Sequence, residues 1–164
     1  MNTRNLEITL TVFVMVAALL TGGCSKRSAH AAWSSSDSIV IEPGVGIGSV
    51  HSGMTIQQVI SELGQPERTN DSDLEYTNIG LYVSPGKSEV VRVVGVFPPF
   101  AGRTQEGIGM GSSRVDVIQA YGEPTDVKPI KPGFEVLRYN TLGLNFELHD
   151  GKVDSIGVIF RITQ

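Results

Sequence analysis

Cysteine is almost absent, since Cys24 is the only one in 164 residues. A single thiol cannot form an intrachain disulfide, so the fold must be held together by side-chain packing. Charged side chains are also few, and the formal net charge is −4. This balance argues against a nucleic-acid partner and against a generally electrostatic grip on anionic lipid. A membrane-spanning run is missing too, because the longest uncharged apolar stretch, residues 8–20, is shorter than the about 20 residues that a spanning helix needs.

The apolar stretch has the length of the hydrophobic region of a signal peptide. It ends in residues 20–24, LTGGC, which resemble the lipobox of bacterial lipoproteins. The resemblance implies a signal peptide over residues 1–23, cleavage before Cys24, and acylation of the Cys24 thiol and new amino group. The alternative is ordinary cleavage after the A-x-A sequence of residues 29–31. We favour the first site because Lys26 and Arg27 separate the hydrophobic region from the second.

More than one acyl chain gives stable membrane anchoring, whereas a single chain gives only marginal binding. Ser25, rather than an aspartate, follows Cys24. In bacteria with two membranes this resembles a lipoprotein sorted to the outer membrane. We therefore expect an outer-membrane, lipid-anchored protein that faces the periplasm. The alternatives are a lipoprotein of the inner or plasma membrane, or a secreted protein.

Residues 24–38 are small and polar and show no apolar periodicity, which predicts a flexible tether between membrane and domain. Trp33 is the exception in this segment. It has two interpretations: a ring resting on the bilayer interface or the domain surface, or an anchor for a partner.

The remainder of the chain contains an internal duplication. Residues 53–66 match residues 111–124, and residues 74–81 match residues 137–144. In the first copy Thr55 and Gln58 predict a capping box, and apolar residues at i, i+3, i+4 and i+7 predict one buried helix face. The capping residues and helix-ending glycines of both copies are Thr55, Gln58, Gly64, Ser113, Asp116 and Gly122.

Alternating apolar residues follow each predicted helix, as in the run from Leu144 to Leu148 before the turn at Asp150-Gly151. The predicted fold class is α+β, with two tandem pseudo-symmetric repeats, each a short helix followed by an antiparallel β-meander. The repeats span residues 39–100 and 101–164 and share one core in one compact domain.

The motif G-[M/S]-[T/S]-x-x-x-V-I-x-x-[L/Y]-G-x-P over residues 53–66 and 111–124, with the meander after it, resembles the SmpA/OmlA (BamE-like) family of outer-membrane lipoproteins. It is also similar to the tandem-repeat β-lactamase-inhibitor-protein fold. The resemblance covers most of residues 44–162, and its motif residues are caps, core and helix stops. It therefore supports the fold more than the function.

The sequence motifs that could indicate ligand or metal binding are weak. The glycine-rich residues 107–113 lack the lysine of a phosphate-binding loop, and the acidic triplet of residues 71, 73 and 75 lacks the glycine and glutamate of a calcium loop. No two of the histidines, His30, His51 and His149, have metal-ligand spacing. We expect no catalytic residues, no cofactor and no metal.

Two further aromatic residues are candidates for partner binding. Phe100 ends the sequence FPPF of residues 97–100 and is either a partner anchor or a core residue. Tyr82 is expected to point outward from its strand. The functional hypothesis is a non-catalytic lipid-anchored envelope lipoprotein that acts as a protein-binding or scaffold module, for example as an accessory in outer-membrane assembly. The alternative is an inhibitor of a secreted or periplasmic enzyme.

Overall fold

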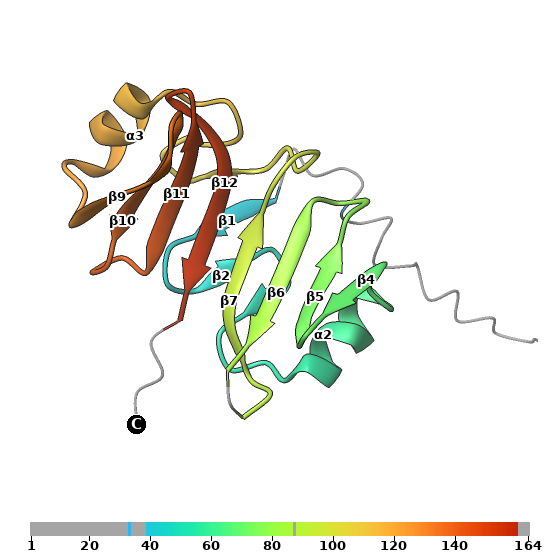
Figure 1. Cartoon of the computed structure of the whole chain (residues 1–164). Coiled ribbons are helices and arrows are strands. Elements are labelled where there is room, and N and C mark those ends of the chain that lie inside the picture. The colour runs from blue at the N-terminus through green and yellow to red at the C-terminus, as the bar shows by residue number, and fades with distance from the viewer. Residues whose placement is uncertain (1–32, 34–38, 87, 161–164) are drawn as a thin grey trace, which may run out of the picture.

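A computed structural model describes residues 33, 39–86 and 88–160 of the chain (Figure 1). The predicted signal peptide, Cys24 and most of the predicted tether lie outside the described residues. Among the residues that are described, no helix is long and apolar enough to cross a membrane.

The largest element is an eight-stranded antiparallel sheet with the strand order β4-β5-β6-β7-β12-β11-β10-β9. β7 and β12 pair in its middle and join two groups of four strands (Figure 1). The strands are β4 (Arg68–Asn70), β5 (Asp73–Tyr76), β6 (Leu81–Pro85), β7 (Val91–Val96), β9 (Asp126–Lys131), β10 (Phe134–Tyr139), β11 (Leu144–His149) and β12 (Lys152–Ile159).

A second, smaller sheet has the order β3-β2-β1-β8. Its strands are β1 (Val40–Glu42), β2 (Gly46–Ile47), β3 (Val50–His51) and β8 (Arg103–Thr104). β1 runs antiparallel to β2 but parallel to β8, which lies about sixty residues further along the chain. The N-terminal strands are thereby fastened to the segment that follows β7.

Two short helices, α2 (Ile56–Leu63) and α3 (Arg114–Tyr121), begin and end as the sequence predicts. Thr55 and Ser113 each accept a hydrogen bond from the backbone N–H three residues on, and the side chain there accepts one in return. Hydrogen bonds from Ser113 hold the pKa of the Asp116 carboxyl below its ordinary value. Gly64 and Gly122 end the helices with positive φ angles, which favour glycine.

Tyrosines from the large sheet form hydrogen bonds with the C-terminal ends of both helices. The Tyr76 hydroxyl donates to the carbonyl oxygen of Gly64 at 3.0 Å, and the Tyr139 hydroxyl donates to that of Gly122 at 2.9 Å. Each bond satisfies a carbonyl at a helix end, where intrahelical partners run out.

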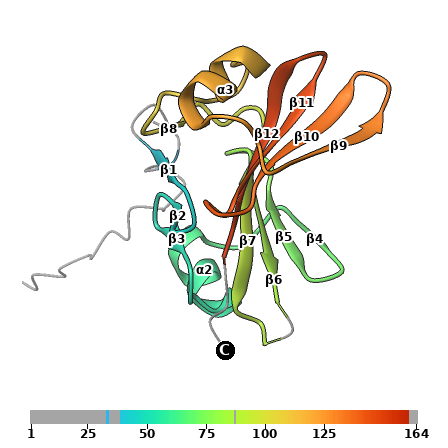
Figure 2. The ribbon, with the colours of Figure 1, turned by 90° about the vertical axis from the view of Figure 1, so that its left-hand side faces the viewer.

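The core lies between the large sheet and the elements on one side of it. Both helices and the small sheet lie on the same face of the large sheet, and no element of the described residues covers the opposite face (Figure 2). The largest fully buried side chains belong to these packed layers: Tyr76, Phe146, Ile41, Ile47, Leu63, Leu81 and Leu137. We call the uncovered side the open face.

This architecture corrects the predicted fold class. The molecule is mostly β with only two short helices, and it is not an arrangement of two helix-plus-meander repeats. The strands merge into one eight-stranded sheet, and a second sheet is present that the repeat pattern did not predict. Moreover, that second sheet pairs β1 with β8, so it combines residues from both predicted repeats.

Candidate binding surface

One row of paired residues crosses the open face from edge to edge, with one residue from each of the eight strands. Paired residues in neighbouring strands point to the same side of a sheet, so the eight side chains share one surface. In strand order the row is Arg68, Glu75, Tyr82, Gly95, Gly157, Asn145, Arg138 and Asp126. We call it the central row.

Two glycines form the middle of this row. Gly95 of β7 pairs with Gly157 of β12, so the two central strands carry no side chain at this point of the open face. Glycine in a strand interior weakens the strand and commonly marks a place where another group approaches the backbone closely. Here that group is the ring of Tyr82, because a Cβ added to Gly95 would overlap its ring atoms.

The Tyr82 ring lies over Gly95 and is partly buried. It stacks on Phe97, with 6.5 Å between ring centroids and 26° between the planes. Its hydroxyl reaches toward β12, where a Cβ added to Gly157 would lie 3.5 Å from the hydroxyl oxygen. The two rings give the open face an aromatic centre on one side of the glycine pair.

Burial raises the pKa of Tyr82 to about 12, and the nearby carboxylates of Glu147 and Asp73 raise it further, while a hydrogen bond with Ser155 acts in the opposite direction. The phenol is therefore protonated at neutral pH. In this state its hydroxyl can donate a hydrogen bond to a partner on the open face.

Asn145 lies on the other side of the glycine pair, opposite Gly157. Its side-chain oxygen is buried and has no hydrogen-bond partner among the described residues. A buried, unsatisfied acceptor costs about 1–3 kcal/mol. Such a group in a folded protein requires an explanation. Because the oxygen is buried, a ligand or partner could bring a donor to it only if the atoms that cover it move.

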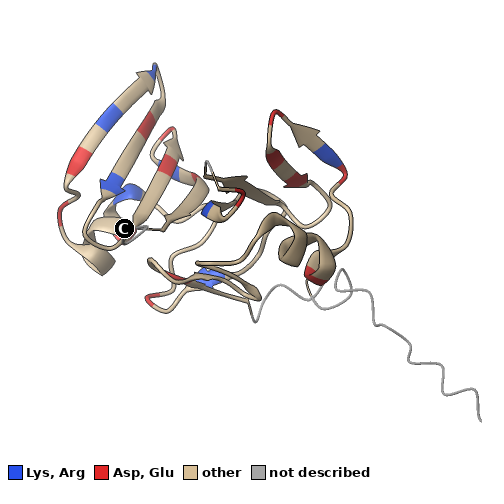
Figure 3. Ribbon diagram, turned by 90° about the horizontal axis from the view of Figure 1, so that it is seen from below, with Lys and Arg blue, Asp and Glu red and all other residues tan. Residues whose placement is uncertain are grey.

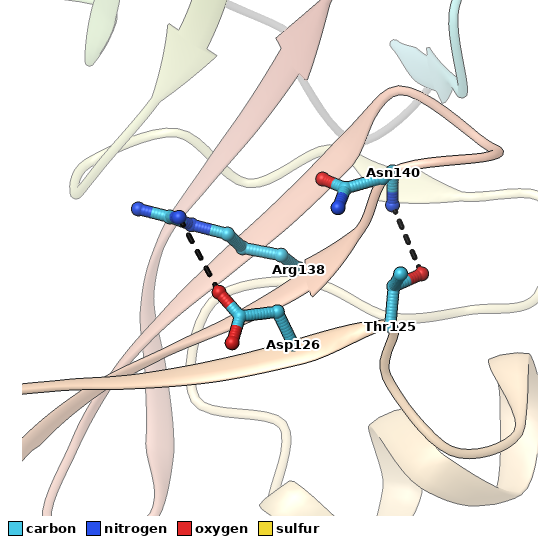
Figure 4. A network of polar contacts seen from close by, with 4 residues as sticks. All are labelled: Thr125, Asp126, Arg138 and Asn140. Carbon is cyan, nitrogen blue, oxygen red and sulfur yellow. Dashed lines mark hydrogen bonds and ion pairs between the residues drawn. The ribbon is translucent and has the colours of Figure 1, made fainter.

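Ion pairs close both ends of the central row. Arg68 and Glu75 approach to 3.7 Å, and Arg138 and Asp126 to 3.3 Å. Beside the second pair, the Asn140 backbone N–H donates to the Thr125 hydroxyl at 3.3 Å (Figure 4). These side chains are substantially exposed, so the pairs add little stability. Their effect is to neutralise the ends of the row and leave its middle uncharged.

The three residues predicted to bind a partner lie in different environments. Trp33 and Phe100 are only 5% and 3% exposed, and their ring centroids lie 6.4 Å apart. Both rings therefore pack in the core rather than on the surface. Tyr82 is the member of the set that reaches the open face. Cys24 lies outside the described residues.

The glycine-rich segment, the acidic triplet and His149 take part in local hydrogen bonds and ion pairs. In the glycine-rich segment the Gly109 backbone N–H donates to the Ser112 hydroxyl, and Arg103 donates to the Gly107 carbonyl oxygen. Glu75 of the acidic triplet pairs with Arg68, and His149 pairs with Asp150. No group of three or more metal-ligating side chains occurs within the part of the chain that the structure describes.

Sequence reasoning missed both glycines and Asn145 as members of a site. Gly95 and Gly157 belong to strands separated by the whole second half of the fold, and only the β7–β12 pairing brings them together. Asn145 lies between buried Leu144 and Phe146 on β11, and this alternation predicts a solvated side chain. Its lack of a partner is visible only in three dimensions.

The fold and this surface define a mainly β domain whose large sheet is packed on one face and open on the other. No family model matches the chain, and no curated protein matches its sequence. Among solved structures, the chain is similar to the crystal structure of a DUF4309 family protein, YjgB, from Bacillus subtilis. The TM-score is 0.52 at 15% sequence identity, over 83% of this chain and 95% of the other. At this identity the likeness concerns the fold alone.

Proposed function

We propose that this protein is a non-catalytic, lipid-anchored lipoprotein of the cell envelope that binds a protein partner on the open face of its large sheet. The lipobox-like sequence and Cys24 support the anchor, with the domain held at the outer membrane and facing the periplasm. An accessory role in outer-membrane assembly, which the resemblance to SmpA/OmlA proteins implies, is one form of this function.

The observation that carries the proposal is the middle of the central row. The Tyr82 ring covers Gly95 and has a protonated hydroxyl, and Asn145 lies opposite Gly157 with an unpartnered buried oxygen. A partly apolar surface with a few fixed polar groups suits protein recognition, in which aromatic residues supply much of the binding energy. The Asn145 oxygen is buried, so a partner N–H would satisfy this acceptor only after displacing the atoms that cover it.

The proposal assigns no reaction to this surface. Tyr82 titrates far above neutral pH, so its hydroxyl acts as a hydrogen-bond donor and not as a base. The nearest carboxylates, Glu147 and Asp73, act on it through their charge. An inhibitor of a secreted or periplasmic enzyme remains the alternative, because an inhibitor would use the same open face.

A site-specific cross-linking experiment tests the proposal. A photo-reactive amino acid replaces Ser84, which neighbours Tyr82 on β6, in cells that produce the protein; the control position is Val45, which is 52% exposed and lies near the small sheet. We expect one cross-linked protein from position 84 and none from position 45. Equal or absent cross-linking at both positions would contradict a partner on the open face.

Two results distinguish the anchored binding module from the inhibitor: the identity of the cross-linked protein, and whether its capture requires Cys24. An envelope protein that is captured only while Cys24 is intact supports the anchored module, and a soluble enzyme that is still captured from a Cys24→Ala variant supports the inhibitor.

The substitution Asn145→Leu provides a second test with two readouts. Replacing the unsatisfied amide by an apolar group of similar size should raise the free energy of unfolding by about 1 kcal/mol. The same change should weaken the cross-link at position 84, because the partner loses its acceptor. Asn140→Leu, which changes an exposed asparagine at the turn after β10, serves as the control. A variant that is stabilised and still fully cross-linked would remove Asn145 from the site.

A further inference from the structure

Trp33 belongs to the predicted tether by its position in the sequence, but the structure places its ring inside the fold. The ring is 5% exposed, and its centroid lies 6.4 Å from that of the buried Phe100 ring. It also packs closely on Gly48, between β2 and β3, because a Cβ added there would come within 2.9 Å of the Trp33 ring. Trp33 is therefore held against the small sheet and the segment after β7, several residues before β1 begins.

This packing shortens the free part of the tether. Fifteen residues separate Cys24 from Ile39, which directly precedes β1, and an extended chain of that length reaches about 50 Å. Only nine residues separate Cys24 from Trp33, so the reach is about 30 Å while the ring is in place. The Trp33 contact thus removes a large part of the distance over which the domain could move from its anchor.

The shorter reach restricts how the domain can be oriented at a membrane. A compact chain of about 120 residues has a radius of gyration of about 14 Å, which corresponds to a diameter of about 35 Å. To turn the open face toward the bilayer, the tether would have to pass from the small sheet round the edge of the domain. That path is half the circumference, about 55 Å, and nine residues cannot cover it.

Trp33 and the open face lie on opposite sides of the large sheet. The small sheet on which Trp33 packs lies over one face, and no element of the described residues covers the other (Figure 2). The charges of the described residues give no competing orientation, because acidic and basic side chains are interspersed along the elements (Figure 3) and the net charge is −4. Attraction to anionic lipid needs clustered basic residues instead.

We propose that Trp33 is an intramolecular latch that directs the open face away from the membrane. The ring holds the end of the tether against the small sheet, so the covered side of the domain faces the bilayer and the open face points into the aqueous compartment. This orientation fits a partner that presents its binding surface in water, and not a partner surface embedded in lipid. The inference rests on the lipid anchor of the proposed function.

Two insertion variants of the full acylated protein test the latch. Twelve glycine and serine residues are inserted either between Ser28 and Ala29, before the latch, or between Ser35 and Ser36, after it. The first insertion raises the reach of the tether to about 70 Å, whereas the second leaves it at about 30 Å. The second is the matched control, because the entropy cost of closing the loop between Trp33 and β1 grows only slowly with its length.

Energy transfer to the bilayer measures the orientation. The proteins are anchored in phosphatidylcholine vesicles that contain acceptor-labelled lipid, and a donor dye is attached to Val45→Cys or to Glu147→Cys. Val45 is 52% exposed and lies in the turn between β1 and β2, on the covered side. Glu147 is exposed and alternates with buried Phe146 and Leu148, so it points to the open face. Acylated Cys24 has no free thiol, so the dye reacts only with the introduced cysteine.

The fluorescence of Trp33 shows whether the latch is closed, since this is the only tryptophan of the chain. We expect emission at short wavelength and protection from acrylamide quenching in the anchored protein and in both insertion variants. Long-wavelength, freely quenched emission from the anchored protein would overturn the proposal.

In the original protein, we expect energy transfer from position 45 to exceed that from position 147 several-fold. The insertion before Trp33 should bring this ratio close to one, and the insertion after Trp33 should preserve it. Equal transfer from both positions in the original protein, or the same response to both insertions, would overturn the latch and leave the anchor intact. Absence of transfer from both positions would show that the protein is not anchored, and would overturn the anchor together with this inference.

Discussion

The substitution Gly95→Ala tests the close approach of Tyr82 to the glycine pair. An added Cβ at this position would overlap the Tyr82 ring, so the ring has to leave its place over the backbone. Overpacking costs typically 1–3 kcal/mol, and the lost stacking of Tyr82 on Phe97 adds about 0.5–1.5 kcal/mol. Replacing a glycine inside a strand by alanine stabilises the fold by about 0.5–1 kcal/mol, which offsets part of this cost. The net loss should be about 2 kcal/mol.

Gly157→Ala is the matched control, because the same change is made at the residue paired with Gly95. There the added Cβ would lie 3.5 Å from the Tyr82 hydroxyl oxygen, which is ordinary van der Waals contact. This variant should unfold within about 0.5 kcal/mol of the original protein. Urea unfolding followed by circular dichroism measures both variants, with the midpoint and the slope fitted separately.

A double-mutant cycle attributes the loss to the ring. In a Tyr82→Ala background nothing opposes the new methyl group, so Gly95→Ala should be neutral or stabilising by up to about 1 kcal/mol. The interaction energy between the two sites should be about 2 kcal/mol. If Gly95→Ala costs the same in both backgrounds, or no more than Gly157→Ala, the ring does not occupy this place and the description of the open face is wrong.

Three further predictions concern the tyrosines and the core. Phe100→Ala should lower the free energy of unfolding by about 3–5 kcal/mol, measured by urea unfolding, because the ring is buried; a surface anchor would cost little. Tyr82→Phe should remove one phenol that titrates near pH 12 in an ultraviolet titration. Since the Tyr82 pKa is raised from 10.0, its contribution to stability is complete below pH 10 and is lost as the pH rises through 12, so the variant should resist alkaline unfolding better. Tyr139→Phe should cost about 1 kcal/mol in thermal unfolding by removing the hydrogen bond to Gly122, and a cost near zero would show that this bond is not made in solution.

Local signals predicted the helices and the hairpin turns well. The caps at Thr55 and Ser113 form as the spacing of their partners indicates, and Asp150-Gly151 joins β11 to β12. These features depend on interactions over three or four residues, which a sequence displays directly.

The small sheet could not be predicted in this way. Its strands contain two or three residues each, which is too short for an alternating pattern to be recognised. The parallel pairing of β1 with β8 joins segments about sixty residues apart and leaves no local trace. The internal duplication therefore predicted two units, whereas long-range pairing produces one large sheet and one small sheet that combines both halves.

The candidate surface was predictable only in part, for a related reason. Outward orientation of Tyr82 follows from strand alternation, and this expectation agrees with its place on the open face. Trp33 and Phe100 were candidates because large aromatic residues in polar or loop segments suggest anchors, but the two rings bury each other. Asn145 carried no signal, because an asparagine between buried residues on a strand is ordinary when its side chain is solvated.

The middle of the central row lowers the stability of the sheet, whereas the residues of the packed face raise it. Two adjacent glycines weaken the pairing of the central strands, and Asn145 keeps a buried acceptor without a donor. On the packed face the same strands carry fully buried branched and aromatic side chains, including Val94, Phe146 and Val158. Gly95 makes room for the Tyr82 ring, so the residues that a solvated sheet face does not need are Gly157 and the unsatisfied Asn145. Local features that oppose stability while the rest of the sheet favours it are typical of functional sites. This contrast, more than the exposure of the face, supports the proposal that a partner binds there.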